Sequence, residues 1–174
     1  ALVAAARFIL DVRRVVMSVA GRQVGTVGKI QAEPGAPNVI PGRVTMILEL
    51  RDLDERVIQS LFDRICEAAM RAGDETGTAF TFAPLGDAAP PALMNARIRE
   101  AIAAAAESLG LSRMAFPSGA GHDAQNMARL APAGMIFVPS RGGISHSPRE
   151  FTSIEDIAAG ADVLLRTLIA LDGL

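Results

Sequence analysis

The sequence is poor in cysteine, in histidine and in net charge. A single cysteine, Cys66, among 174 residues excludes an internal disulfide bond and fits a protein of the cytoplasm. Its place inside a helical pattern favours a small buried apolar residue over a nucleophile. Seventeen basic and nineteen acidic residues leave a net charge of -2, so the composition gives no support for a nucleic-acid partner.

Long apolar runs are also missing. No run reaches the roughly 18 residues that a membrane-spanning helix needs, so we expect no membrane partner. The opening stretch ALVAAARFILDVRRVV carries arginines within and after its apolar part, unlike a signal peptide. Half of the residues are apolar and 21% are charged, which is enough to bury a core. Because the chain starts with Ala1 inside a helical pattern, we expect it to be a piece of a longer protein.

The first half of the sequence predicts the order helix, strand, strand, helix, strand. This is the order of a split βαββαβ unit whose first strand is absent, and we expect the missing strand upstream of Ala1. The predicted elements are a helix ending near Gly21, strands over 24–33 and 43–52, a helix from the N-cap Asp54 to Gly73, and a third strand over 78–84 (TAFTFAP).

The proline-containing stretch GDAAPP, over 86–91, resembles a linker and predicts a domain boundary between residues 1–86 and 87–174. One convincing strand is too little sheet to stand alone, so the second part is predicted to be an incomplete α/β layer. Its predicted elements are a helix over 92–109, a short helix from about Ala124, the strand AGMIFVPS, and a last helix over 153–171 that starts with a Thr152–Glu155 capping box.

Both histidines of the chain lie in glycine-rich loops. His122 lies in SGAGHDA at a predicted helix start, and His146 lies in GGISHSP, just past the predicted buried strand. In open α/β sheets, ligands gather at the carboxyl ends of strands, and imidazole is a common metal ligand and acid or base. A lone loop histidine is as readily a surface residue, but two in such loops favour a site.

Other chemistries fit the loops less well. Ser145 lacks the second glycine of a G-x-S-x-G elbow, and its neighbour His146 is poorly placed in sequence to deprotonate it. A serine-dependent amidase using Ser145 or Ser118 stays an alternative, and it predicts activity that survives a chelator. The stretches GTVG and GAGHD lack the strand and helix context of a dinucleotide site.

Two polar residues of the first half are candidates for binding an anion. Asn38 lies in the proline-rich loop PGAPNVIPG, and Arg51 lies at the end of the second predicted strand, on the face opposite its apolar side chains. A guanidinium group binds a carboxylate with two parallel hydrogen bonds, and a nearby amide fixes its orientation. The alternative is an ordinary surface arginine paired with Glu49 or Asp52.

Three stretches, taken in order, resemble the zinc-dependent amidohydrolases that act on N-carbamoyl-L-amino acids, β-ureidopropionate or allantoate. They are TVGKIQAEPGAPNVIPGRVTMILELRD, PSGAGHDAQNMARLAPAGMIFVPSRGGISHSPREFTS and the last helix. These enzymes are the hydantoinase/carbamoylase branch of the aminoacylase and carboxypeptidase superfamily. The resemblance implies an α/β fold in two incomplete domains. Residues 1–86 would be a ferredoxin-like lid that also forms a homodimer, and residues 87–174 the C-terminal part of a metallopeptidase-like catalytic domain.

The resemblance also implies roles for four residues. His146 would be a ligand of one of two metal ions, zinc or alternatively Mn²⁺, Co²⁺ or Ni²⁺. His122 would contact or polarise the scissile group of the substrate. Asn38 and Arg51 would bind the carboxylate of a small ureido or amide substrate as the lid closes.

The implied reaction is hydrolysis of a carbamoyl or amide C–N bond by a metal-activated water. The other metal ligands and the general base of such enzymes are missing from this sequence, so we expect the chain to be inactive by itself. The competing hypothesis is a non-catalytic remnant that serves only for dimerisation or another association.

Overall fold

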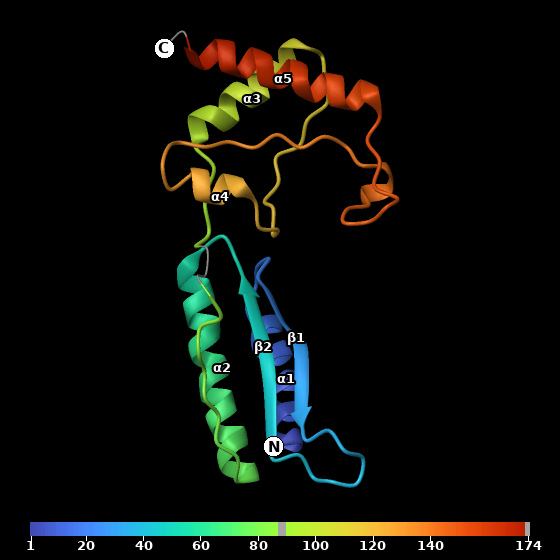
Figure 1. Cartoon of the computed structure of the whole chain (residues 1–174). Coiled ribbons are helices and arrows are strands. Elements are labelled where there is room, and N and C mark those ends of the chain that lie inside the picture. Colours follow the sequence, from blue (N-terminus) through green and yellow to red (C-terminus); the bar gives the residue numbers. More distant parts are fainter. Residues whose placement is uncertain (87–89, 173–174) are drawn as a thin grey trace. The chain divides into compact units, whose positions relative to one another are not determined.

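The computed structural model describes residues 1–86 and 90–172, and the chain divides into two compact units, Ala1–Pro91 and Ala92–Leu174 (Figure 1). The boundary predicted from the sequence lies earlier, between residues 86 and 87, and residues 87–89 of the predicted linker lie outside the described part. The assignment of the two units to a lid and a catalytic domain stays a prediction. Within the described ranges, no helix combines the length and the apolar character needed to cross a bilayer.

The first unit packs two helices against a β-hairpin (Figure 1). Its elements are α1 (Leu2–Met17), β1 (Val24–Glu33), β2 (Arg43–Arg51) and α2 (Glu55–Thr76). The strands pair antiparallel, with Val24 opposite Arg51 and Glu33 opposite Arg43, and the register shifts between Val27 and Lys29. The predicted order is therefore confirmed from the first helix through the second.

The core of this unit lies between the two helices and one face of the hairpin. Phe8 and Val12 of α1 meet Leu61 and Ile65 of α2, and all four are almost fully buried. The helices bury one stripe each, at the spacing of i, i+3, i+4 and i+7. Alternate residues of the strands face the same core, because side chains alternate across a strand. The strand residues packed against it are Val27, Met46, Leu48 and Leu50.

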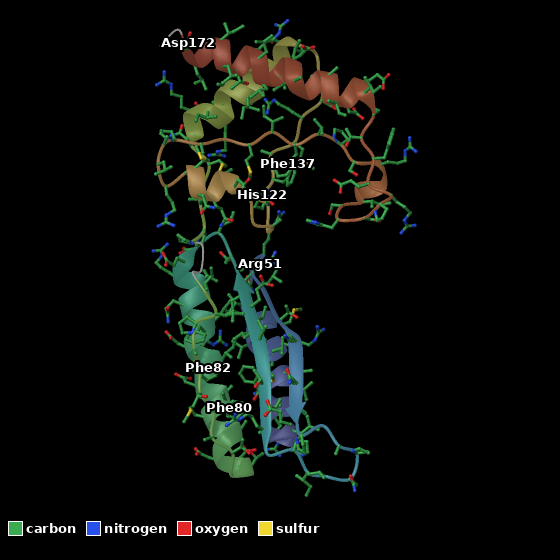
Figure 2. The ribbon with its side chains drawn as sticks, viewed as in Figure 1. Arg51, Phe80, Phe82, His122, Phe137 and Asp172 are labelled. Atoms are coloured by element: carbon green, nitrogen blue, oxygen red, sulfur yellow. The ribbon has the colours of Figure 1, made fainter. Side chains whose placement is uncertain are left out.

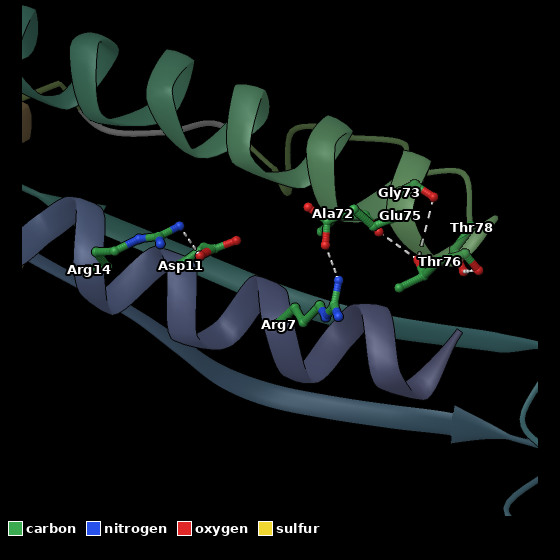
Figure 3. Close-up of polar contacts among 8 residues, drawn as sticks. All are labelled: Arg7, Asp11, Arg14, Ala72, Gly73, Glu75, Thr76 and Thr78. Carbon is green, nitrogen blue, oxygen red and sulfur yellow. Dashed lines mark hydrogen bonds and ion pairs between the residues drawn. The ribbon is translucent and has the colours of Figure 1, made fainter.

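A polar contact ties the two helices together at one end. Arg7 of α1 forms an ion pair with Glu75 of α2, near the place where Thr76 donates from Oγ1 to the carbonyl oxygen of Ala72 at 2.6 Å (Figure 3). Because both charged side chains are largely exposed, this pair adds little to the stability that the apolar core supplies.

The helix α2 begins as predicted and ends later than predicted. Asp54 is its N-cap, with Oδ1 accepting the backbone N–H of Arg56 at 2.9 Å. The prediction of Gly73 at the C-terminal end is wrong, because Gly77, with φ 62°, is the left-handed residue that ends the helix. Gly73 is needed for close packing instead, because a Cβ atom there would lie 2.5 Å from the carbonyl oxygen of Thr78.

The predicted third strand, 78–84, is extended but forms no strand ladder with any described residue, so this prediction is wrong. Its aromatic side chains nevertheless join the core. Phe80 lies 5.6 Å from Phe8 between ring centroids, and Phe82 lies 5.6 Å from Phe62, edge to face. The segment therefore has the side-chain packing of a strand without the backbone pairing of one.

The second unit contains α3 (Ala96–Ser108), α4 (Asp123–Met127), a 3₁₀ turn η1 (Arg141–Gly143) and α5 (Ile154–Asp172). Its small core joins Ala105 and Ala106 of α3 to Val163 of α5. The first helix begins after its N-cap Asn95 rather than at residue 92, and the last is capped by Ser153 and Asp156 instead of the predicted Thr152–Glu155 pair.

The predicted strand over 133–140 is also extended without a ladder partner among the described residues, so this prediction is wrong. The segment contacts both long helices of its unit. A Cβ atom at Gly134 would lie 2.4 Å from Cγ2 of Ile98 in α3, and one at Gly160 of α5 would lie 2.4 Å from Cγ1 of Val138. The two glycines therefore allow the segment to pass close to both helices, while Phe137 stays 47% exposed.

The core of the first unit makes a direct prediction. Replacing Ile65, which is 0% exposed, with Ala should lower the free energy of unfolding by about 2–5 kcal/mol, because the substitution leaves a cavity between α1 and α2. Urea unfolding followed by far-UV circular dichroism measures this, since the chain has no tryptophan or tyrosine to report by fluorescence. The control Ile40→Ala, at a side chain 91% exposed, should change it by less than about 0.5 kcal/mol. Equal effects of the two substitutions would contradict this description of the core.

Candidate functional site

His122 lies in the second unit near Phe137 (Figure 2). Contacts with two side chains hold its ring. Its Nε2 atom lies 2.7 Å from Oγ of Ser118, within hydrogen-bonding distance. Its ring meets Phe137 edge to face, with 5.4 Å between centroids and 70° between planes. Phe116 packs on the same Phe137 ring at 5.3 Å. The half-buried imidazole is therefore fixed by one polar and one aromatic contact.

The backbone around His122 explains this placement. The Oγ atom of Ser118 accepts the N–H of Ala120 at 3.2 Å, which closes a local turn two residues before the histidine. His122 is the N-cap of α4, and its own N–H donates to Oε1 of Gln125 at 3.3 Å, as in a capping box. The serine turn and the helix start thus define the path of the chain on both sides of the imidazole.

His146 has a different environment. It is exposed and lies in the left-handed region with φ 54°, and its backbone N–H donates to Oε2 of Glu150 at 3.0 Å. Such a φ is uncommon for a residue with a Cβ atom. The sequence predicts a buried strand just before this loop, but the segment there neither pairs with a strand among the described residues nor is fully buried, since Val138 is itself exposed.

The described residues do not by themselves fit a metal centre. In residues 1–86 and 90–172, no group of three or more histidine, cysteine, aspartate or glutamate side chains is close enough together to hold an ion. A protein zinc site usually takes four ligands, or three with an open position. The role of His146 as a metal ligand therefore stays a prediction.

Arg51 lies at the end of β2, on the exposed face of the hairpin, as the alternation predicts (Figure 2). Its Nε and terminal NH2 donate to Oε1 of Glu49 at 3.0 and 2.7 Å. The surface pairing with Glu49 that the sequence analysis names as an alternative is therefore present. The guanidinium N–H groups that donate to the Glu49 carboxylate are the same kind of donor that a substrate carboxylate would need.

Asn38 is exposed in the loop that joins β1 to β2, and it lies at the opposite end of the hairpin from Arg51. The eight residue steps from Arg43 to Arg51, at about 3.4 Å each, put roughly 27 Å between the two ends of β2. One copy of the hairpin therefore does not bring Asn38 and Arg51 to the same carboxylate. The prediction that Asn38 and Arg51 bind one carboxylate did not include this restriction.

The thiol of Cys66 is not set up as a nucleophile. Burial raises the pKa of this thiol above its ordinary value, and the nearby charge of Asp63 raises it further. Because the thiolate is the reactive form, a raised pKa leaves Cys66 mostly unreactive at neutral pH. This agrees with the prediction that Cys66 is not a nucleophile, but its side chain is half-buried in α2 and not fully buried as the prediction had it.

Ser118 and Phe137 are the residues of this site that sequence reasoning missed as neighbours of His122. A local signal exists for the serine, since a hydroxyl two residues before Ala120 and four before the histidine can close such a turn. Phe137 lies far from His122 in sequence, inside a stretch that alternation assigns to a strand. No local pattern identifies this contact.

Comparison with known proteins agrees with the loop motifs. The family model described as peptidase family M20/M25/M40 matches residues 8–170. An N-carbamoyl-L-amino-acid amidohydrolase from Paenarthrobacter aurescens is 37% identical over 172 residues, which is 99% of this chain and 42% of that protein. An allantoate amidohydrolase from Bacillus subtilis (strain 168) is 38% identical over 154 residues, which is 84% of this chain and 35% of that protein.

A solved structure gives the same result for the fold. An amidase of the hydantoinase/carbamoylase family from Burkholderia multivorans, 34% identical, superposes with a TM-score of 0.86 and covers 98% of this chain and 41% of that one. The chain thus spans about two fifths of the length of the relatives it matches. These matches confirm the resemblance carried by NVIPGR, SGAGHDA and GGISHSP, and the chain belongs to peptidase family M20/M25/M40.

Proposed function

We propose that this chain is part of a metal-dependent amidohydrolase that hydrolyses the carbamoyl or amide C–N bond of N-carbamoyl amino acids or related ureido acids. The observation that carries the proposal is the similarity along 99% of the chain to an N-carbamoyl-L-amino-acid amidohydrolase. The chain spans only 42% of that relative, so we expect the 174 residues to be inactive without further polypeptide. The non-catalytic association module stays the competing proposal.

The proposed metal requires ligands from outside this chain. His146 would supply one imidazole, and its exposed position leaves the ring open to other polypeptide. The bound metal, zinc or alternatively Mn²⁺, Co²⁺ or Ni²⁺, would supply Lewis-acid chemistry for hydrolysis. The described residues do not complete the site, so this chain would contribute through its own side chains, His122, Arg51 and Asn38.

His122 would act at the scissile group. A half-buried imidazole N–H that donates to the carbonyl oxygen of the ureido group draws electron density from its carbon and so favours attack by water. The contact with Ser118 supports this role, because it leaves Nε2 in a hydrogen-bonding position rather than packed in the core. The general base lies outside this chain.

Arg51 would bind the substrate carboxylate in place of Glu49. Ion pairs at exposed positions contribute about 0–1 kcal/mol, so a substrate carboxylate competes with Glu49 at little cost. Asn38 would then act on the carboxylate at Arg51 of a second copy. Twofold pairing of one hairpin edge with its copy is antiparallel, and antiparallel pairing brings the loop end of one hairpin to the open end of the other. The homodimer therefore reconciles the two predicted roles with the length of the hairpin.

The metal role of His146 predicts a loss of bound metal. In the complete enzyme, His146→Asn should lower the metal content measured by inductively coupled plasma mass spectrometry, together with turnover. Asn is a suitable replacement because it tolerates the left-handed backbone that His146 adopts, whereas a β-branched residue would strain it. The matched variant His122→Asn should keep the metal and lose turnover. Unchanged metal content in His146→Asn would remove this residue from the ligand set.

The carboxylate role of Arg51 predicts a selective effect on substrate binding. Arg51→Ala should raise KM for N-carbamoyl amino acids about tenfold to a hundredfold, because charged hydrogen bonds of about 1.5–3 kcal/mol are lost. It should have little effect on the analogue whose carboxylate is replaced by a carboxamide. The control Glu49→Gln removes the carboxylate that forms the ion pair with Arg51 and should not raise KM. Equal losses for the acid and the carboxamide would argue against carboxylate binding.

The shared site predicts complementation between two variants of the complete enzyme that bind the substrate carboxylate poorly, assayed at a substrate concentration far below the KM of either variant. Mixing Asn38→Ala and Arg51→Ala chains at random gives mixed dimers in which one of the two sites has both residues intact. About half of the dimers are mixed, so about a quarter of the wild-type activity should return. If both residues act within one copy, no site in the mixture is intact and activity stays at the level of the separate variants.

A further inference from the structure

We propose that Ser118 is a positioning residue for His122, whose hydroxyl oxygen accepts a hydrogen bond from Nε2–H and holds the imidazole as a donor. The inference rests on the proposed function, in which that donor acts at the scissile group. It goes beyond the roles implied by the resemblance, which give Ser118 no part in positioning His122.

The hydroxyl group of Ser118 is itself held in place. Its Oγ atom accepts the backbone N–H of Ala120 at 3.2 Å, which limits the rotation of the serine side chain. The same oxygen lies 2.7 Å from Nε2 of His122 and is half-buried. A short loop therefore contains both the anchor and the ring, and Ser118 has a defined position before any substrate binds.

Phe137 restrains the ring in a second direction. Its edge-to-face contact with the imidazole, at 5.4 Å between centroids, limits rotation of the ring away from Ser118. Phe116 packs on Phe137 at 5.3 Å and keeps that phenyl ring in place. Because the imidazole has only two side-chain torsions, one hydrogen bond and one aromatic contact are enough to define its orientation.

The proposed function indicates which nitrogen carries the proton. The backbone N–H of Gln125 donates to the carbonyl oxygen of His122 at 2.9 Å, so the start of α4 does not assign the tautomer of the ring. The nitrogen beside Ser118 is Nε2. A ring that donates from this nitrogen to the carbonyl oxygen of a substrate must carry its proton on Nε2.

The direction of the hydrogen bond between Ser118 and His122 distinguishes a positioning serine from a nucleophilic one. A nucleophilic Ser118 would donate its hydroxyl proton to Nε2, as in a serine hydrolase, and the neutral ring would carry its proton on Nδ1. In the arrangement proposed here the proton lies on Nε2 and the serine oxygen accepts it. A carbonyl oxygen of the substrate can then accept from the same Nε2–H beside Ser118 without any change of tautomer.

Nuclear magnetic resonance of the 174-residue chain tests the inference directly. The chain has only two histidines, so a long-range ¹H–¹⁵N spectrum contains two imidazoles, and His146→Asn identifies the one from His122. At alkaline pH, where histidine side chains are neutral, we expect Nε2 of His122 to be protonated and Nδ1 unprotonated. Protonation of Nδ1 instead would overturn the proposal, and this measurement needs no substitution of Ser118.

Substitutions then test the positioning itself. The ring protons of His122 should show a shift caused by Phe137, which Phe137→Leu should abolish. Ser118→Ala should move these shifts toward random-coil values, and Ser118→Thr, which keeps a hydroxyl group, should restore them. Ser112→Ala, at an exposed serine of the same unit, should leave them unchanged. Shifts that are the same in wild type and Ser118→Ala, with far-UV circular dichroism also unchanged, would overturn the role.

The complete enzyme separates this inference from the proposed function. Ser118→Ala should lower kcat by about tenfold with little change in KM, and Ser118→Thr should recover most of the loss. Turnover that survives a chelator but disappears in Ser118→Ala would overturn the proposal in favour of a serine nucleophile. If His122→Asn leaves turnover unchanged while the spectra behave as expected, the proposed function of His122 fails and the positioning contact stands.

Discussion

A β-strand requires a neighbouring strand, and this requirement governs both units of the chain. Buried backbone N–H and C=O groups must be paired, so a segment with the composition of a strand becomes one only beside a partner. Here β1 and β2 satisfy each other as a hairpin. The segments 78–84 and 133–140 are extended and send side chains to their cores, yet neither pairs with a strand among the described residues. Under the proposed function, strands that pair with these segments would come from polypeptide outside this chain, which spans about two fifths of the length of its relatives.

Local patterns predicted the helices and the hairpin because their hydrogen bonds are made by near neighbours in sequence. The N-cap Asp54 and the alternation of β2 are examples, and both are confirmed. The two failed strands have a correct local pattern and lack a distant partner, which no local pattern supplies. The error at the end of α2 has another cause. Gly73 and Gly77 look alike in sequence, but one allows close packing and the other a left-handed turn.

The same distinction between local and distant contacts applies to the residues of the candidate site. The loop motifs identified His122 and His146 by residue type, and the parity of β2 put Arg51 on the exposed face. The contact between His122 and Phe137 depends on how the segment over 133–140 crosses its unit, which the sequence does not disclose. The separation of Asn38 from Arg51, in contrast, follows from the hairpin itself. A loop between two antiparallel strands lies at the end opposite the last residue of the second strand, so the sequence already contained this restriction.

The two recognition groups differ in how firmly they are held, and the difference matches their proposed tasks. Arg51 is about half exposed and pairs with a carboxylate on its own strand, an interaction that water screens and another carboxylate can replace. His122 is half-buried, fixed by a serine whose oxygen is already bound to the backbone, and packed against an aromatic ring. A group that captures a carboxylate benefits from exchange at low cost, whereas a group that acts on a reacting carbonyl must keep its orientation to within a fraction of an ångström. The exposed pair and the restrained imidazole are therefore suited to binding and to chemistry, respectively.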